Sequence, residues 1–93
     1  MFNVQSFIDS LPDDTTCIDI SNKQLTVIPD LSRFTKLKQL DCSNNNLTSL
    51  PVLNDTFEKL NCSSNQLSSL PSLNENLENL HCYNNRLTSL PTF

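Results

Sequence analysis

Only a few side chains in this sequence could take part in catalysis. His81 is the single histidine, and Asp41 and Ser63 are the acid and the hydroxyl that it would need as partners. A hydroxyl, an imidazole and a carboxylate can together transfer an acyl group, but only within hydrogen-bond reach of one another. The repeat described below separates Asp41 from His81 by two strands, about 10 Å. We therefore expect no catalytic residues and no enzyme activity.

The cysteines could form disulfides or bind a metal. Cys42, Cys62 and Cys82 recur at one fixed interval, at a position where the upstream segment has Ile20. This exchange with an apolar residue predicts three reduced thiols packed in the interior. Cys17 lies outside the series and is expected to be more exposed. Because the sequence has no Cys-x-x-Cys pair and one histidine, we expect no metal site.

The composition excludes several other classes of ligand. The sequence contains no glycine, so it has none of the glycine-rich loops that bind phosphates or dinucleotides, and we expect no cofactor. The net charge of −4 predicts no basic surface for nucleic acid or anionic lipid. No segment approaches the roughly 20 apolar residues of a membrane span, and the first residues lack the features of a signal peptide. These features predict an intracellular, cytoplasmic protein.

A short repeat dominates the sequence. The segment LKQLDCSNNNLTSLPVLN returns as FEKLNCSSNQLSSLPSLN and again as LENLHCYNNRLTSLPTF. The upstream segment TCIDISNKQLTVIPDL has the same pattern, but a longer connection, SRFTK, separates it from the next copy. Self-similarity at a fixed period of about 20 residues is typical of solenoids. We predict a cap at residues 1–14 and four repeats at 15–36, 37–56, 57–76 and 77–93.

The side chains of one repeat indicate how the coils must pack. The side chains of Leu40 and Cys42 are expected to point into the interior and that of Asp41 to point outward. This alternation is typical of a short strand. Asn45 follows at the bend, where its side chain can hydrogen-bond the backbone of its own coil and of the neighbouring coil. In the absence of glycine, left-handed turn positions must fall to asparagine. One coil cannot bury its leucines alone, so we predict stacked coils with strands about 4.8 Å apart in a parallel sheet.

The pattern LxxLxCxxNxLxxLPxL resembles the leucine-rich repeat, in the short Leu-Pro-rich form familiar from bacterial effectors and related microbial and giant-virus proteins. The resemblance covers residues 15–93. It implies an α/β solenoid: a fragment of a right-handed horseshoe with a parallel concave β-sheet and extended or 3-10 segments on the convex side. It also implies a non-catalytic module that binds a protein partner, in the host cytoplasm if the protein is viral or an effector.

The two ends of the solenoid are expected to differ. A short helix that begins at Asn3 or Ser6 and ends at Leu11-Pro12 would cap the first coil, with four apolar residues on one face: Phe2, Phe7, Ile8 and Leu11. We expect no such cap on the last coil, so that its strand would be a free edge. An alternative to partner binding is therefore self-association, as a homodimer or a larger assembly, through Cys82, Leu87, Leu90 and Phe93. A further alternative, from the family resemblance, is a host-directed effector or adaptor.

The outward positions of the strands are where a partner would bind. Repeat position places Asp19, Asp41, Asn61 and His81 in one column, and Ser21, Ser43, Ser63 and Tyr83 in a second. Variation at exposed positions of a fixed scaffold favours a recognition surface, although the same columns are compatible with a merely solvated sheet face. The predicted partner-binding surface on the concave face comprises Asp19, Gln39, Asp41, Lys59, Asn61, His81 and Tyr83.

Overall fold

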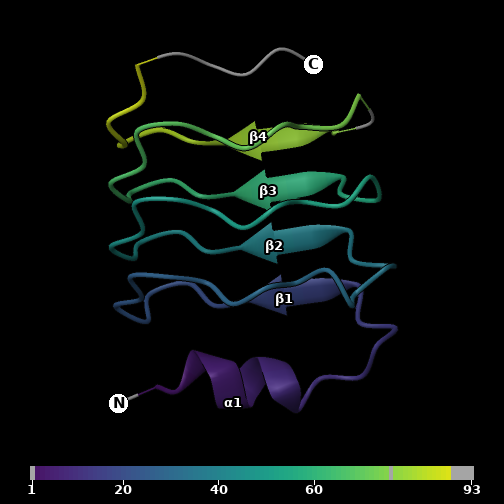
Figure 1. Ribbon diagram of the computed structural model, residues 1–93. Coiled ribbons are helices and arrows are strands. Elements are labelled where there is room, and N and C mark those ends of the chain that lie inside the picture. Colours follow the sequence, from purple (N-terminus) through teal and green to yellow (C-terminus); the bar gives the residue numbers. More distant parts are fainter. Residues whose placement is uncertain (1, 76, 89–93) are drawn as a thin grey trace.

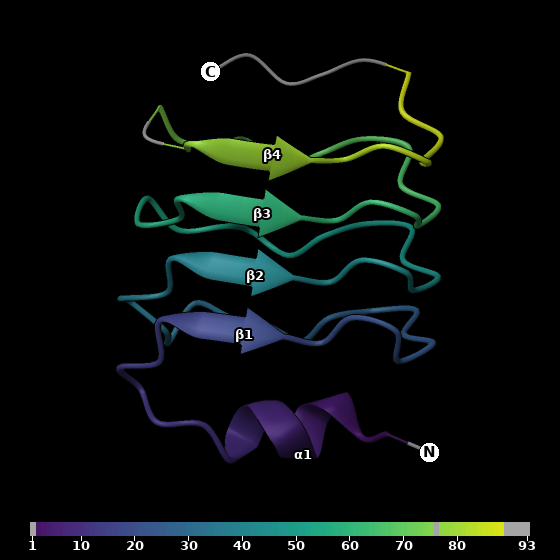
Figure 2. The same ribbon diagram turned by 180° about the vertical axis from the view of Figure 1, so that it is seen from behind.

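The computed structural model describes residues 2–75 and 77–88, which form one short helix followed by four short strands. The elements are α1 (Val4–Asp9), β1 (Cys17–Asp19), β2 (Gln39–Asp41), β3 (Lys59–Asn61) and β4 (Asn79–His81). The strands form one parallel sheet in the order β1-β2-β3-β4, and α1 lies below β1 at the N-terminal end of the stack (Figure 1, Figure 2). This arrangement confirms the predicted solenoid with a parallel sheet and a short N-terminal helix.

Equivalent residues of successive repeats are direct neighbours in the sheet. Leu40 in β2 is paired with Ile18 in β1 and with Leu60 in β3, and Leu60 is paired with Leu80 in β4. The sequence separation between paired residues is therefore larger from β1 to β2 than from β2 to β3, and it is the same from β3 to β4 as from β2 to β3. These separations match those of the sequence repeat. One strand falls in each of the four predicted repeats.

Apolar side chains from successive coils stack inside the solenoid and form its core. Leu47 and Leu67 are fully buried, and so are the thiols of Cys42 and Cys62. Burying one leucine contributes about 1.5–3 kcal/mol, and a leucine reaches this burial only when a neighbouring coil covers it. The predicted stack of buried thiols is confirmed at these two cysteines. Cys82 is only half-buried, because no strand pairs with the outer side of β4 in the described part of the chain.

Buried asparagine side chains join each coil to the one before it. The amide group of Asn45 donates to the carbonyl oxygens of Cys42 in its own coil and Ile20 in the preceding coil, at 2.9 and 3.0 Å. Its Oδ1 accepts a hydrogen bond from the backbone N–H of Leu25 at 2.9 Å. Asn65 makes the equivalent bonds to the coil before it. These bonds confirm that the asparagine serves both its own and the neighbouring backbone.

The direction of these bonds explains why the first coil lacks the asparagine. Asn85 also donates to a carbonyl of the preceding coil, that of Cys62, and accepts from the N–H of Leu67. The first coil is preceded by α1, so there is no earlier coil for an asparagine to join (Figure 1). Lys23 stands at the corresponding position of the first coil.

The left-handed backbone positions lie in the bend that follows each strand. Asn22, Asn44 and Asn84 have positive φ angles of 56°, as the absence of glycine predicts. The prediction is wrong at Ser64 and Gln24, whose φ angles are 57° and 58°. Ser64 is the counterpart of Asn44 and Asn84, so the stacked coil imposes a left-handed conformation that serine itself does not favour.

The convex side is extended and contains isolated turns. Backbone bonds from Phe34 to Leu31 and from Leu37 to Phe34 close single turns of the 3-10 type, but residues 2–75 and 77–88 form no 3-10 helix. A second asparagine series lies on this side and was not expected from the sequence. Asn54 donates to the carbonyl of Phe34 at 2.8 Å, and the next repeat has Asn74 at this position.

Helix α1 begins as the sequence predicts and ends earlier. The side chain of Asn3 accepts a hydrogen bond from the N–H of Ser6 at 3.0 Å and so caps the helix. The helix ends at Asp9 with Ser10 as the C-cap, two residues before the predicted stop at Leu11-Pro12. Ile8 is buried against the first coil, whereas three other apolar residues of this segment are half-buried: Phe2, Phe7 and Leu11.

Candidate functional site

The outward face of the sheet forms a shallow groove of about 650 Å³. We call it the concave groove. It runs across all four strands, and its polar lining consists of Cys17, Asp19, Gln39, Asp41, Lys59, Asn61, Asn79 and His81. Because each strand contributes to it, a ligand in this groove would contact every repeat at once.

Two columns of side chains line the concave groove. The paired residues Asp19, Asp41, Asn61 and His81 form the first column, and Cys17, Gln39, Lys59 and Asn79 form the second. The structure thus brings together six of the seven residues of the predicted surface. The prediction omits Cys17 and Asn79, although repeat position alone places them in the same column as Gln39 and Lys59.

Tyr83, the seventh predicted residue, lies elsewhere. It follows β4 by two residues and is 61% exposed, but it does not line the concave groove. The chain has already left the strand at this point, so the alternation of inward and outward side chains no longer applies.

The prediction that the serines of one column face outward is wrong at two positions. Ser43 and Ser63 are 6% and 2% exposed. The hydroxyl of Ser43 donates to Oδ1 of Asp41 at 2.6 Å, and its backbone N–H donates to the same atom at 3.1 Å. Asn61 and Ser63 repeat this arrangement. The serines therefore turn in to hold the groove residues in place instead of facing a partner.

The same turn affects the titration of Asp19. Hydrogen bonds from the hydroxyl and then the backbone N–H of Ser21 lower the pKa of Asp19, and the charge of Lys23 lowers it further. Burial acts in the opposite direction, and more strongly than the charge of Lys23. The carboxylate is therefore held in its charged form, with its orientation fixed by a neighbouring residue.

Charges are distributed unevenly along the concave groove. Asp19 and Asp41 lie side by side on β1 and β2, and Lys59 lies on β3. The described residues contain two ion pairs, Arg33–Asp13 and Lys38–Glu58. Neither involves a residue of the groove, so no ion pair within the described chain neutralises the groove charges.

The structure brings no catalytic arrangement together among the described residues. Ser63 is buried and bonded to Asn61, while Asp41 and His81 lie two strands apart. Residues 2–75 and 77–88 contain no group of three or more side chains placed to hold a metal ion. No helix within these ranges is long and apolar enough to cross a membrane.

The four thiols are free but differ in their surroundings. Burial, aided by the nearby Cys82, raises the pKa of Cys62 to about 12. Burial likewise raises the pKa of Cys42. Cys17 is exposed as expected, and its thiol donates to the side-chain oxygen of its neighbour Gln39 at 3.3 Å. Of the four thiols, that of Cys17 is therefore the most open to reagents in solution.

Residues 16–55 match the family model "Leucine Rich repeats (2 copies)". The matched segment contains β1 and β2, and β3 and β4 continue the same sheet in the same register. Residues 16–55 are therefore identified as leucine-rich repeats. Domains of this class generally mediate protein–protein interaction and are generally non-catalytic. No curated protein matches the chain, and the resemblance to the bacterial effector form stays a prediction.

Proposed function

We propose that this protein is a non-catalytic interaction module that binds a protein partner in the concave groove. The observation that carries the proposal is the contrast between the two sides of the sheet. Inward positions hold the similar residues Ile18, Leu40, Leu60 and Leu80, whereas the neighbouring outward column changes from aspartate to asparagine to histidine. A uniform interior with a varied outer face supports recognition on the outer face.

The rigidity of the groove also supports this function. Oδ1 of Asp41 and Oδ1 of Asn61 are each held by a following serine, and the strands are tied together by the buried asparagines. Side chains that are already fixed lose little conformational entropy when a partner binds. The concave groove therefore presents a preorganised polar surface.

The proposal is tested by capture of partners from a cell extract with matched variants. In the groove variant, Asp41→Ala, Lys59→Ala and His81→Ala are combined; in the control variant, Thr48→Ala and Ser68→Ala alter exposed residues outside the groove lining. A groove partner is captured by the wild type and the control but at least about tenfold less by the groove variant. Equal capture by all three proteins would contradict the proposal.

Self-association is the second candidate function, and the exposed state of the last described strand favours it. Leu80 in β4 is half-buried, whereas Leu60, its neighbour in β3, is 1% exposed. The predicted association surface includes Cys82 and Leu87, which are also half-buried, and Leu90 and Phe93, which lie outside the described residues. Free strand edges next to apolar side chains promote pairing between chains.

Sedimentation over a wide range of protein concentration distinguishes the two functions. A monomer at the highest concentration would exclude self-association. If the protein associates, Leu87→Ala should weaken the association and the groove variant should leave it unchanged. The opposite pattern would place the contact in the concave groove.

A further inference from the structure

The concave groove is polarised along the axis of the solenoid. Its acidic side chains, Asp19 and Asp41, belong to the first two strands, and its cation, Lys59, belongs to the third. Asp19 and Asp41 are also paired residues of adjacent strands. Like charges at directly opposite positions of a sheet repel each other, so this pair is unfavourable in the free protein.

The nearby charge of Lys23 offsets only part of this repulsion, and no ion pair of the described residues involves either aspartate. Both ion pairs of the described residues lie away from the groove, at Asp13 and at Glu58. The lowered pKa of Asp19 keeps its carboxylate charged at neutral pH. Lys59 is exposed on the other half of the groove. A bound cation over the aspartates would remove the repulsion, and a bound anion would pair with Lys59.

We infer that the concave groove selects a peptide segment of its protein partner that places a basic side chain over Asp19 and Asp41 and an acidic side chain over Lys59. This inference rests on the proposed function and adds the charge pattern of the partner. The occupant is a protein segment, because the groove crosses four strands and has side chains of both signs, whereas a nucleic acid or an anionic lipid surface would meet the two carboxylates unfavourably.

The geometry also sets the spacing of the two charges. Lys59 lies about one and a half strand spacings across the sheet from the midpoint between Asp19 and Asp41, and two residues away from it along the strand direction. The separation is therefore about 10 Å. An extended chain covers this distance in about three residues. The partner segment therefore carries its arginine or lysine about three positions from its aspartate or glutamate.

Selection from a library of short random peptides displayed on phage tests this pattern. The wild type is compared with the double variant Asp19→Asn and Asp41→Asn, with Lys59→Gln, and with the outside control Thr48→Ala. Asparagine is suited to the aspartate position because Asn61 makes the same turn with Ser63. Circular dichroism confirms that each variant is folded before selection.

The expected result is that peptides enriched on the wild type and on the control share a basic residue about three positions from an acidic one. The double variant loses the preference for the basic residue, and Lys59→Gln loses the preference for the acidic one. For a selected peptide, Lys59→Glu weakens binding by at least about tenfold, and exchange of the acidic residue of the peptide for lysine restores it.

Two failures have different meanings. The inference is overturned if the selected peptides bind the groove but lack this charge pattern, or if none of the variants changes the pattern. Either result leaves the proposed function intact. Enrichment that is the same on the wild type and on the groove variant of the preceding section overturns both. A lack of rescue by the charge exchange overturns the pairing with Lys59.

Discussion

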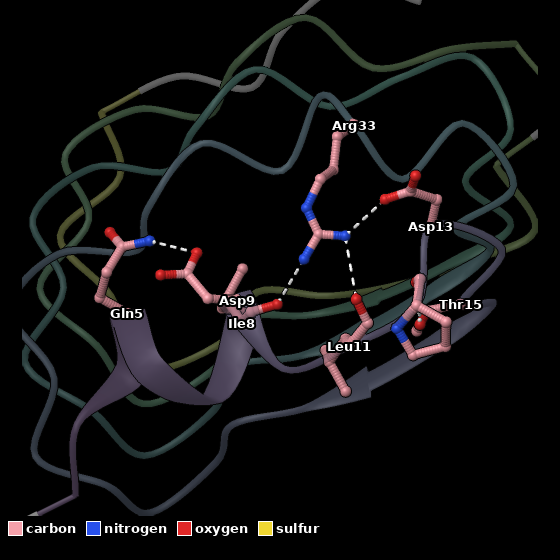
Figure 3. A network of polar contacts seen from close by, with 8 residues as sticks. Gln5, Ile8, Asp9, Leu11, Asp13, Thr15 and Arg33 are labelled. Carbon is pink, nitrogen blue, oxygen red and sulfur yellow. Dashed lines mark hydrogen bonds and ion pairs between the residues drawn. The ribbon is translucent and has the colours of Figure 1, made fainter.

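Nη2 of Arg33 donates a hydrogen bond of 2.6 Å to the carbonyl oxygen of Ile8, in the last turn of α1 (Figure 3). Nη1 of the same side chain reaches the carbonyl of Leu11 at 3.0 Å and the carboxylate of Asp13 at 2.9 Å. Arg33 lies in the connection that makes the first repeat step longer than the later ones. The irregular step thus provides the residue that joins the cap to the solenoid.

Replacing Arg33 should loosen the cap. Arg33→Ala removes the donors for two carbonyl groups, that of Ile8 in α1 and that of Leu11 just after it, and we expect it to lower the free energy of unfolding by about 1–2 kcal/mol. Asp13→Asn should change it by less than about 0.5 kcal/mol, because that carboxylate is largely exposed. Urea unfolding followed by circular dichroism measures both. An equal loss in the two variants would show that the ion pair, not the carbonyl bonds, holds the cap.

The buried asparagines should matter most in the middle of the stack. Asn65→Ala leaves the N–H of Leu47 without its partner and removes one of the two amide donors to the carbonyl of Cys42, and a buried polar group left unpaired costs about 1–3 kcal/mol. We expect a total loss of about 2–4 kcal/mol. Asn85→Ala should cost less because Asn85 is only half-buried. Thermal and urea unfolding of both variants, with the exposed Gln66→Ala as control, give the order; an equal cost at both positions would contradict it.

The sequence predicts the stacked part of this fold well because a repeat brings each residue next to its own copy. Ile18, Leu40 and Leu60 share one column for this reason, and six of the seven predicted surface residues line the groove. The prediction failed where the strand ends. The turn made by Asp41 with Ser43 draws the serine inward, and strand alternation cannot reveal such a local hydrogen bond.

Two other features, the contacts of Arg33 and of Asn54, could not be predicted because they depend on how neighbouring segments pack. The role of Arg33 follows from the position of α1, which the repeat does not determine. The bonds of Asn54 require the convex connection of the preceding coil to pass close to it. Both features arise where the sequence departs from strict repetition or where the coil is neither strand nor core.

Ser64 offers a site for stabilisation. Its φ of 57° lies in the left-handed region, where its counterparts in the second and fourth coils are Asn44 and Asn84. Ser64→Asn should raise the free energy of unfolding by about 0.5 kcal/mol, because asparagine tolerates this region better than serine. Ser64→Ala should lower it. The exposed Ser68→Asn is the control in urea unfolding, and a destabilised Ser64→Asn would contradict the conformational argument.

The thiols should react in the order of their burial. Cys17 is exposed and should be alkylated rapidly by iodoacetamide at mildly basic pH, whereas burial raises the pKa of Cys62 to about 12 and shields it from the reagent. Peptide mass spectrometry of the native protein should find label on Cys17 well before Cys62. In urea all four cysteines should react at similar rates. Native labelling of Cys62 as fast as that of Cys17 would show that the stacked core opens readily.

Asp19 should make the free energy of unfolding depend on pH in the acid range. Its pKa in the folded protein is lowered from the usual value of 3.8, chiefly by the hydroxyl of Ser21. A carboxyl group with a lowered folded pKa binds its proton more weakly in the folded state than in the unfolded state, so its contribution is present above the unfolded pKa and is lost as pH falls through the folded pKa. The contribution should be small because the side chain is exposed.

Asp19→Asn isolates this contribution, because asparagine makes the same turn at Asn61 without titrating. Between about pH 6 and about pH 3 the stability of the wild type should fall more than that of Asp19→Asn, and the two curves should converge or cross at the acid end. Urea unfolding across this range measures the difference. Parallel curves would mean that the serine bonds do not distinguish charged from protonated Asp19, and that the carboxylate is not held in the groove by Ser21.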